Sequence, residues 1–145
     1  MVRIDDYEVA EGLYYSKEFV WMRVEDGTVR IGVTDFVQHK LGEIGYVEFE
    51  GARKSINQLK QGRPFGAVES AKGVFDFIAP VSGSVQQINE QVRSNPGLMN
   101  KDPYGEGWIL ILAPTNLEKE VGELMNFDEA VQWYKRETPE KFKAW

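Results

Sequence analysis

The hydrophobic positions in the first third of the chain follow the two-residue period of β-strands for most of their length. Residues 13–25 read "LYYSKEFVWMRVE" and are rich in aromatic and β-branched side chains, which predicts a strand. The Asp26-Gly27 pair that follows is typical of a two-residue hairpin turn, so a second strand is expected over 28–33. Residues 43–50, "EIGYVEFE", alternate apolar and polar side chains and predict a third strand.

Between the second and third predicted strands the spacing of apolar residues changes to that of a helix. Thr34 is a favourable N-cap and Gly42 a favourable residue for ending a helix. The apolar side chains between them fall on one helical face, and they are Phe36, Val37 and Leu41. His39, the single histidine of the chain, lies on this helix one turn after Asp35, where we expect a solvated surface position.

Two further predicted strands meet near Lys72, and the last third of the chain turns helical. Residues 66–78 read "GAVESAKGVFDFI", with a strand-like pattern on both sides of the lysine. The run "WILILAP" at 108–114 is fully apolar and predicts a buried strand. Residues 115–137 have the pattern of two short helices, and Pro139 is expected to end the second.

The remaining segments are predicted connections. Residues 51–66 form a glycine-punctuated link that carries basic side chains, and residues 94–108 are dense in turn formers. For the second of these we expect an ordered loop with one helical turn. Many short strands, one early helix and a helical tail predict a mainly β fold, a barrel or sandwich with peripheral helices. A length of 145 residues with 42% hydrophobic content fits one domain, over residues 1–145.

Composition excludes several kinds of chemistry. The chain has no cysteine, which removes disulfides, iron–sulfur clusters, thiolate zinc sites and cysteine nucleophiles, and one histidine cannot build a metal site or a serine-type triad. Demanding chemistry would therefore need a cofactor. The formal net charge is −6 without a Lys/Arg cluster, so nucleic acid is not an expected partner. The acidic start and the absence of a membrane-length apolar run predict a cytoplasmic protein, without secretory signal or membrane segment.

Lys72 stands where two strands meet, in the stretch "GAVESAKGVFD". A solvated lysine at a hairpin is common, but a rigid, exposed lysine on flanking strands is also what an acylating enzyme needs. Glu69 precedes it by three positions, and in an extended strand the two side chains point to opposite faces. Glu69 is therefore better suited to be recognised by such an enzyme than to pair with Lys72.

The segment "VESAK…D…APVSGSV" resembles the lipoyl-attachment segment of the glycine cleavage system H protein family, in which Glu-Ser-x-Lys is followed by Asp and by Pro-(Val/Ile)-Ser-Gly. The stretches "IGVTDFVQHKLGEIGYVEF", "QGRPFGAVES" and "NPGLMNKDPYGEGWILIL" are also similar to that family. The resemblance covers residues 13–113. It implies a lipoyl-domain-like barrel-sandwich hybrid over that core, with a helical C-terminal extension over 114–145.

The resemblance also implies a function. Lipoate would be amide-linked to Lys72, and Glu69 would help the lipoate ligase or lipoyl transferase select its target. The protein would be a non-catalytic carrier that moves the methylamine group of glycine between glycine decarboxylase, aminomethyltransferase and lipoamide dehydrogenase. Separately, we expect a monomer. Biotinyl domains share the fold but flank their lysine with methionines, whereas Ala71 and Gly73 stand here, so biotin is disfavoured.

The chain departs from the family at one position of interest for the loaded arm. Asp76 matches the family's acidic position, but Phe19 and Val20 stand where the family reads His-Glu before its Trp. In an extended strand Glu18 would share a face with Val20 and could compensate for the missing carboxylate.

Two alternatives therefore stay open. One is a lipoate-binding carrier for sulfur oxidation with heterodisulfide-reductase-like enzymes, and the other is an unlipoylated regulatory or scaffold protein.

Overall fold

Two β-sheets packed face to face form the body of the protein in a computed structural model that describes residues 1–49 and 57–144. The larger sheet has the strand order β3-β4-β5-β11-β10-β7, with antiparallel pairing throughout. Its strands are β3 (Tyr14–Tyr15), β4 (Val20–Glu25), β5 (Thr28–Val33), β7 (Gln58–Leu59), β10 (Gly83–Ile88) and β11 (Leu110–Pro114).

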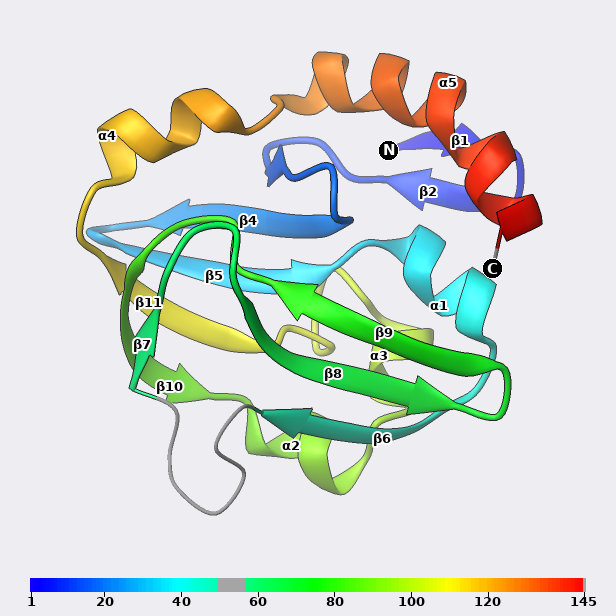
Figure 1. The fold of residues 1–145 in the computed structure, drawn as a ribbon, viewed down its shortest axis with the longest axis horizontal. Helices are drawn as coiled ribbons and strands as arrows, with labels where there is room; N and C mark the ends of the chain where they lie inside the picture. Colours follow the sequence, from blue (N-terminus) through cyan, green and yellow to red (C-terminus); the bar gives the residue numbers. More distant parts are fainter. Residues whose placement is uncertain (50–56, 145) are drawn as a thin grey trace.

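The smaller sheet has three antiparallel strands in the order β6-β8-β9, and β8 and β9 lie at the front of the molecule in Figure 1. Its strands are β6 (Ile44–Phe49), β8 (Pro64–Ser70) and β9 (Gly73–Ile78). A separate N-terminal hairpin consists of β1 (Val2–Ile4) and β2 (Tyr7–Val9). The mainly β class and the barrel-sandwich arrangement expected from the sequence are confirmed.

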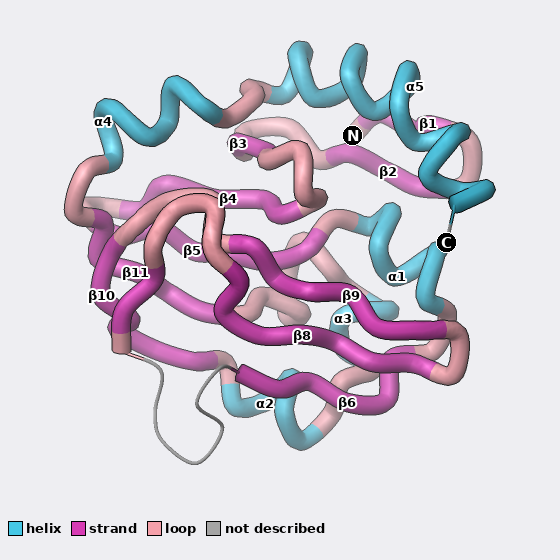
Figure 2. Tube along the Cα trace, in the orientation of Figure 1, coloured by secondary structure: helices cyan, strands magenta, loops and turns pink. Residues whose placement is uncertain are grey.

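Helices lie on the periphery of the two sheets (Figure 2). They are α1 (Asp35–Leu41), α2 (Glu90–Ser94), α3 (Leu98–Lys101), α4 (Leu117–Glu120), the 3-10 turn η1 (Val121–Glu123) and α5 (Phe127–Ala144). In Figure 1, α4 and α5 run along one side of the molecule, and α5 covers the N-terminal hairpin. No helix within the described ranges is both long and apolar enough to cross a lipid bilayer.

The core fills the space between the sheets with side chains from their inner faces. Met22, Ile31 and Leu110 form one cross-strand row of the larger sheet, and each is fully buried. Val68 and Phe77, also fully buried, come from the smaller sheet. Because side chains on opposite strands of one row point to the same face, the alternation along each strand decides which residues reach this core.

Several local predictions are confirmed. Asp26 and Gly27 both have positive φ, 33° and 81°, as a tight two-residue hairpin between β4 and β5 requires. Helix α1 follows Thr34 and is followed by Gly42, with its three apolar residues buried, but the Thr34 hydroxyl does not form the capping hydrogen bond expected of an N-cap. The helical turn expected in the loop over 94–108 is α3. Part of the predicted connection over 51–66, and the last residue of the strand predicted over 43–50, lie outside the described residues.

The prediction of one strand over residues 13–25 is wrong. The chain forms a tight turn at residues 16–19 and folds back, so that β3 and β4 pair with each other. Phe19 closes this turn with a φ of 65°, and its backbone N–H donates to the carbonyl oxygen of Ser16. Glu18 therefore lies in a turn, and it does not share a strand face with Val20.

Pro139 does not end the last helix, contrary to expectation, and α5 continues to Ala144. A proline inside a helix removes one N–H and crowds the preceding turn. Here the Thr138 hydroxyl donates a 2.7 Å hydrogen bond to the carbonyl oxygen of Tyr134, and it also lies 2.8 Å from the Tyr7 hydroxyl. These contacts hold the helix on the N-terminal hairpin at the turn before the proline.

Candidate functional site

Lys72 lies at the tip of the hairpin formed by β8 and β9. Ser70 pairs with Gly73, so Ala71 and Lys72 are the two residues of the turn, and both are exposed. The turn is at one end of the molecule, next to the last turn of α1 (Figure 1). The expectation of a lysine presented at the junction of two strands is met by this arrangement.

The turn is fixed to helix α1 through Ser70. The Ser70 hydroxyl donates a 2.6 Å hydrogen bond to the carbonyl oxygen of Leu41, and its oxygen accepts a 3.1 Å bond from the backbone N–H of Lys72. The Leu41 carbonyl belongs to the end of α1, where carbonyl groups lack partners within the helix. One side chain therefore satisfies that carbonyl and restrains the backbone that carries the lysine.

The Asn100 side chain of α3 forms hydrogen bonds with the link between α1 and β6, close to the Lys72 turn. Its amide nitrogen donates to the carbonyl oxygen of Gly42 at 2.7 Å and to the side-chain oxygen of Gln38 at 3.1 Å. Its oxygen accepts a 2.9 Å bond from the backbone N–H of Ile44. The link between α1 and β6 is thus held at three points. The lysine stem passes over this link, because a Cβ added at Gly42 would lie 3.6 Å from Cε of Lys72.

The ammonium of Lys72 is close to a second cation, the side chain of Lys40, and lies within ion-pair range of no carboxylate that the structure describes. Among the described side chains Lys72 makes no salt bridge. The pKa of Lys40 on α1 is lowered, first by burial and second by the charge of Lys72. A hollow of about 600 Å³ lies between these two lysines and is lined also by Leu41, Gly73 and Val74.

The two acidic residues expected near Lys72 lie on the other face of the hairpin. Glu69 is half-buried and is opposite Val74, while Asp76 is exposed and is opposite Ala67. Because Ser70 points toward α1, its neighbour Glu69 points away from α1. Neither carboxylate pairs with a basic group in the described part of the chain.

Glu18 is exposed and lies at a different place from the lysine. It lines a second cavity, of about 470 Å³, together with residues from the opposite end of the hairpin and from α4. These include Ala79, Pro80 and Glu120. Glu120 is held there by Ser82, whose backbone N–H and hydroxyl each donate a 2.7 Å bond to its carboxylate.

Phe19 and Val20 direct apolar side chains into the core. Val20 is fully buried, and the Phe19 ring stacks on Phe36 and Tyr134 at centroid distances of 4.7 and 5.2 Å. The Tyr134 hydroxyl also donates a 2.8 Å bond to the carbonyl oxygen of Ser16. Helix α5 therefore fixes the turn at residues 16–19, and neither departure from the family pattern offers a polar group here.

His39 is exposed and lies 3.9 Å from the Asp35 carboxylate, as expected for a surface histidine. Within the described residues no group of His, Cys, Asp and Glu side chains could hold a metal ion.

Sequence reasoning did not assign the anchoring roles of Ser70 and Asn100. The serine was visible in the motif around Lys72, but its partner, Leu41, is 29 positions away.

Comparisons with known proteins agree with the geometry. A model of the family "Glycine cleavage H-protein" matches residues 13–137. A probable glycine cleavage system H protein of Pyrococcus abyssi is 44% identical over 136 residues, which are 93% of this chain and 98% of that protein. The glycine cleavage system H protein of Anoxybacillus flavithermus is 41% identical over 126 residues, 86% of this chain and 94% of that protein.

A solved structure gives the same result. The crystal structure of a glycine cleavage system H protein from Mycobacterium marinum superimposes with a TM-score of 0.76 at 30% identity, and the match covers 86% of this chain and 98% of that one. The resemblance of the Lys72 segment, the barrel-sandwich fold and these matches all agree, and the chain belongs to the glycine cleavage H-protein family.

Proposed function

We propose that this protein is a lipoyl carrier with lipoate in amide linkage to the Nζ of Lys72. The observation that supports the proposal is the exposed Lys72 on a two-residue turn that Ser70 ties to α1. H proteins in general bear lipoate, and the residues here suit that group. The lysine makes no salt bridge among the described side chains, and the adjacent hollow is lined by Leu41 and Val74, which suit an aliphatic arm.

The proposed carrier takes the methylamine group of glycine from glycine decarboxylase to aminomethyltransferase and is reoxidised by lipoamide dehydrogenase. When bound, lipoate supplies the disulfide that accepts the group. The chain's own contribution is position, because a group held on a fixed turn meets each enzyme in a near-intramolecular step. We assign no catalytic residue to the protein, and we treat residues 1–145 as one carrier domain.

Three carboxylates receive distinct proposed roles. Glu69, directly before Ser70 on β8, serves recognition by the lipoylating enzyme. Asp76, exposed on β9, contacts the ammonium of a loaded arm. Glu18 offers a second contact only to an arm that extends along β9 as far as the cavity beside Ala79 and Pro80.

A second candidate function is supported by the apolar positions at 19 and 20. Val20 is fully buried and the Phe19 ring is stacked between two other rings, so neither supplies the polar pair that the family has there. A carrier of sulfur species in an oxidation pathway would not need a carboxylate for an ammonium. Exchange of bicarbonate carbon into glycine with glycine decarboxylase distinguishes the two functions, since only a methylamine carrier supports it at ordinary carrier concentration.

The attachment itself is tested by intact mass. The full chain is expressed with a lipoate ligase and free lipoate, beside Lys72→Arg and Lys40→Arg variants. We expect one lipoyl addition in the wild type and in Lys40→Arg, and none in Lys72→Arg. An unmodified wild type, or a modified Lys72→Arg, would disprove the proposed carrier.

A further inference from the structure

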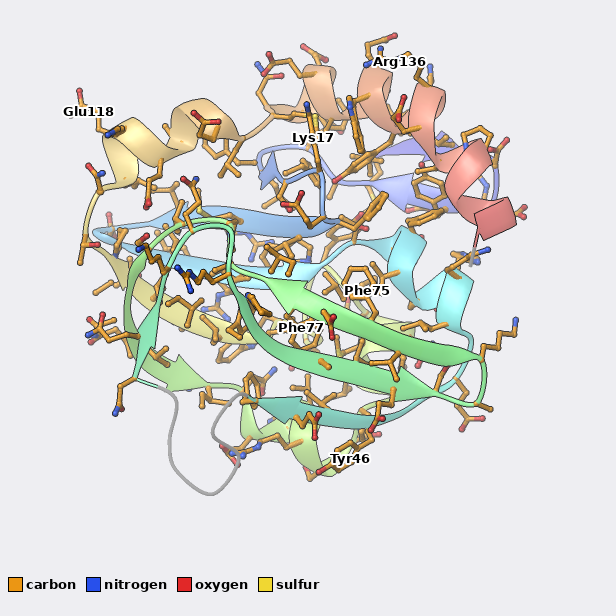
Figure 3. The ribbon with its side chains drawn as sticks, in the orientation of Figure 1. Lys17, Tyr46, Phe75, Phe77, Glu118 and Arg136 are labelled. Atoms are coloured by element: carbon orange, nitrogen blue, oxygen red, sulfur yellow. The ribbon has the colours of Figure 1, made fainter. Side chains whose placement is uncertain are left out.

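The face of the β6-β8-β9 sheet that points away from the core carries an unusual row of side chains beside Lys72. Tyr46 on β6, Glu69 on β8 and Val74 on β9 are direct cross-strand neighbours. They form the second row from the turn, after the Ser70–Gly73 pair, and point to the same side of the sheet. Figure 3 shows Tyr46 beside β6 at the outer surface of the molecule.

This row exposes more apolar surface than is usual for the solvent side of a β-sheet. Tyr46 is 52% and Val74 61% exposed, and they flank the half-buried Glu69. The solvent side of an antiparallel sheet is ordinarily polar. Of the five exposed large apolar side chains in the described ranges, two lie in this one row, and the others are Met1, Tyr14 and Val24.

The next row adds charge. Glu48 on β6, Ala67 on β8 and Asp76 on β9 are cross-strand neighbours, and both acids are exposed. The small side chain of Ala67, at the centre of this row between the two acidic residues, is buried. None of Glu48, Glu69 and Asp76 forms an ion pair with a described side chain. We call these two rows the outer face; its members are Tyr46, Glu48, Ala67, Glu69, Val74 and Asp76.

We propose that the outer face is the docking surface for the enzyme that acylates Lys72, through a partner surface with basic side chains around an apolar centre. The inference rests on the proposed function. Three carboxylates complement basic groups, and Tyr46 and Val74 supply apolar contact area. An aromatic side chain beside charged groups is a frequent centre of protein interfaces. Lys40 lies on α1 in the hollow beside the turn, so charge directs a basic partner away from that hollow and toward the three carboxylates of the outer face.

The acylating enzyme is chosen over the later partners because of where its reaction occurs. Acylation forms the bond between Nζ of Lys72 and the acyl carbon of an activated lipoate, breaks the bond from that carbon to its leaving group, and releases the amine proton. The enzyme's centre must therefore reach the end of the unmodified lysine, and its surface must contact the sheet beside the turn. Enzymes that act on the dithiolane work at the far end of a long arm.

The test measures acylation kinetics of the full apo chain with purified lipoate ligase. The apolar part is reduced in a Tyr46→Ser variant, and Tyr14→Ser is the matched control, since Tyr14 is 37% exposed on β3 of the other sheet. We expect a rise of about tenfold in KM for Tyr46→Ser with kcat within a factor of two, because docking contacts are lost while the lysine and the hollow beside it are untouched. The control should behave as wild type.

The charged part is tested separately in Glu48→Gln/Asp76→Asn, which keeps side-chain size at exposed positions. We expect KM at low salt to rise and its dependence on ionic strength to weaken. Thermal unfolding of each variant confirms its fold, and this second variant provides the test if the first does not fold.

An unchanged KM in the folded variants, or an equal rise in the Tyr14→Ser control, overturns the docking proposal. These failures differ from failure of the carrier function, in which wild-type protein itself receives no lipoyl group at Lys72. If Tyr46→Ser is acylated normally but fails to exchange with glycine decarboxylase, the outer face belongs to that enzyme and the inference is wrong.

Discussion

The hydroxyl of Ser70 donates a 2.6 Å hydrogen bond to the carbonyl oxygen of Leu41 and thereby joins the Lys72 turn to the end of helix α1. The same oxygen accepts the backbone N–H of Lys72. A tight two-residue turn at the end of a three-stranded sheet would otherwise be held only by its own strands. Three buried apolar residues anchor α1 in the core, so this bond also fixes the turn that carries the lysine relative to the core.

Replacing Ser70 with Ala should weaken both the fold and the presentation of the lysine. The Leu41 carbonyl loses its donor, so we expect a loss of about 1–2 kcal/mol in the free energy of unfolding. Lipoylation should slow mainly through kcat, since the outer face is unchanged while the lysine is less well placed. Denaturant unfolding and acylation kinetics measure the two effects.

Ser94→Ala is the matched control, because that hydroxyl makes a 3.3 Å bond at an exposed site on α2. Acylation of Ser70→Ala at the wild-type rate would show that the anchor is not needed for modification.

Two substitutions at Asn100 should lower the stability of the protein by different amounts. In Asn100→Ala the Gly42 carbonyl and the Ile44 N–H lose their partner, which should cost about 1–3 kcal/mol. In Asn100→Asp an ionised oxygen faces the Gly42 carbonyl, so this variant should be the less stable one at pH 7. Acidification protonates the carboxyl, which can then donate, and the difference from wild type should shrink. Unfolding measured at pH 7 and pH 4 tests the order; an Asp variant as stable as wild type at pH 7 contradicts it.

The parts of the fold that could be predicted are determined by short patterns of neighbouring residues in the sequence. The Asp26-Gly27 turn, the ends of α1 and the junction at Lys72 each follow from residues adjacent in sequence. The pattern of "EIGYVEFE" also predicts the strand β6, although a β-bulge between Ile44 and Tyr46 puts these two apolar residues on different faces, so the exposure of Tyr46 does not follow from the alternation.

The errors come from contacts between distant segments. Aromatic and β-branched residues over 13–25 fit a strand, but the chain turns at 16–19 because α5 supplies Tyr134 both as a stacking partner for Phe19 and as a donor to Ser16. These partners are more than a hundred positions apart, and the local pattern does not contain them. The same holds for Pro139, whose helix is retained by the buried contact between Tyr7 and Thr138.

Phe19 offers a test of backbone strain. A φ of 65° is unfavourable for an L-residue with a side chain and costs about 1–2 kcal/mol, which glycine avoids. Both Phe19→Ala and Phe19→Gly lose the stacking with Phe36 and Tyr134, so both should be destabilised by about 3 kcal/mol or more. Their order is diagnostic: the Gly variant should be more stable than the Ala variant by about 1 kcal/mol.

At an ordinary strand position the order is reversed, since glycine loses more conformational entropy on folding. Val24→Ala and Val24→Gly, on β4, provide this comparison, and there the Gly variant should be the less stable. Chemical unfolding of the four variants measures both differences. The same order at both positions would argue that Phe19 is not strained.

Stability should fall in alkaline solution from about pH 10 upward because of buried tyrosines. Burial raises the pKa of Tyr7 to about 12, and it also raises the pKa of Tyr15, Tyr104 and Tyr134. Below pH 10 folded and unfolded chains both keep the phenolic protons. Between pH 10 and 12 the unfolded chain releases the Tyr7 proton while the folded chain retains it, so unfolding is favoured as pH rises. For Tyr7 the difference corresponds to about 3 kcal/mol.

A Tyr7→Phe variant separates this titration from the loss of a hydrogen bond. Without its hydroxyl the contact with Thr138 is lost, which should lower stability by about 1 kcal/mol at neutral pH. Between pH 10 and 12, however, its stability should fall less steeply than that of wild type. Tyr14→Phe, at an exposed position, should keep the wild-type slope. Since the Tyr7 hydroxyl joins the N-terminal hairpin to α5, parallel slopes for wild type and Tyr7→Phe would mean that this contact already opens before the phenol ionises.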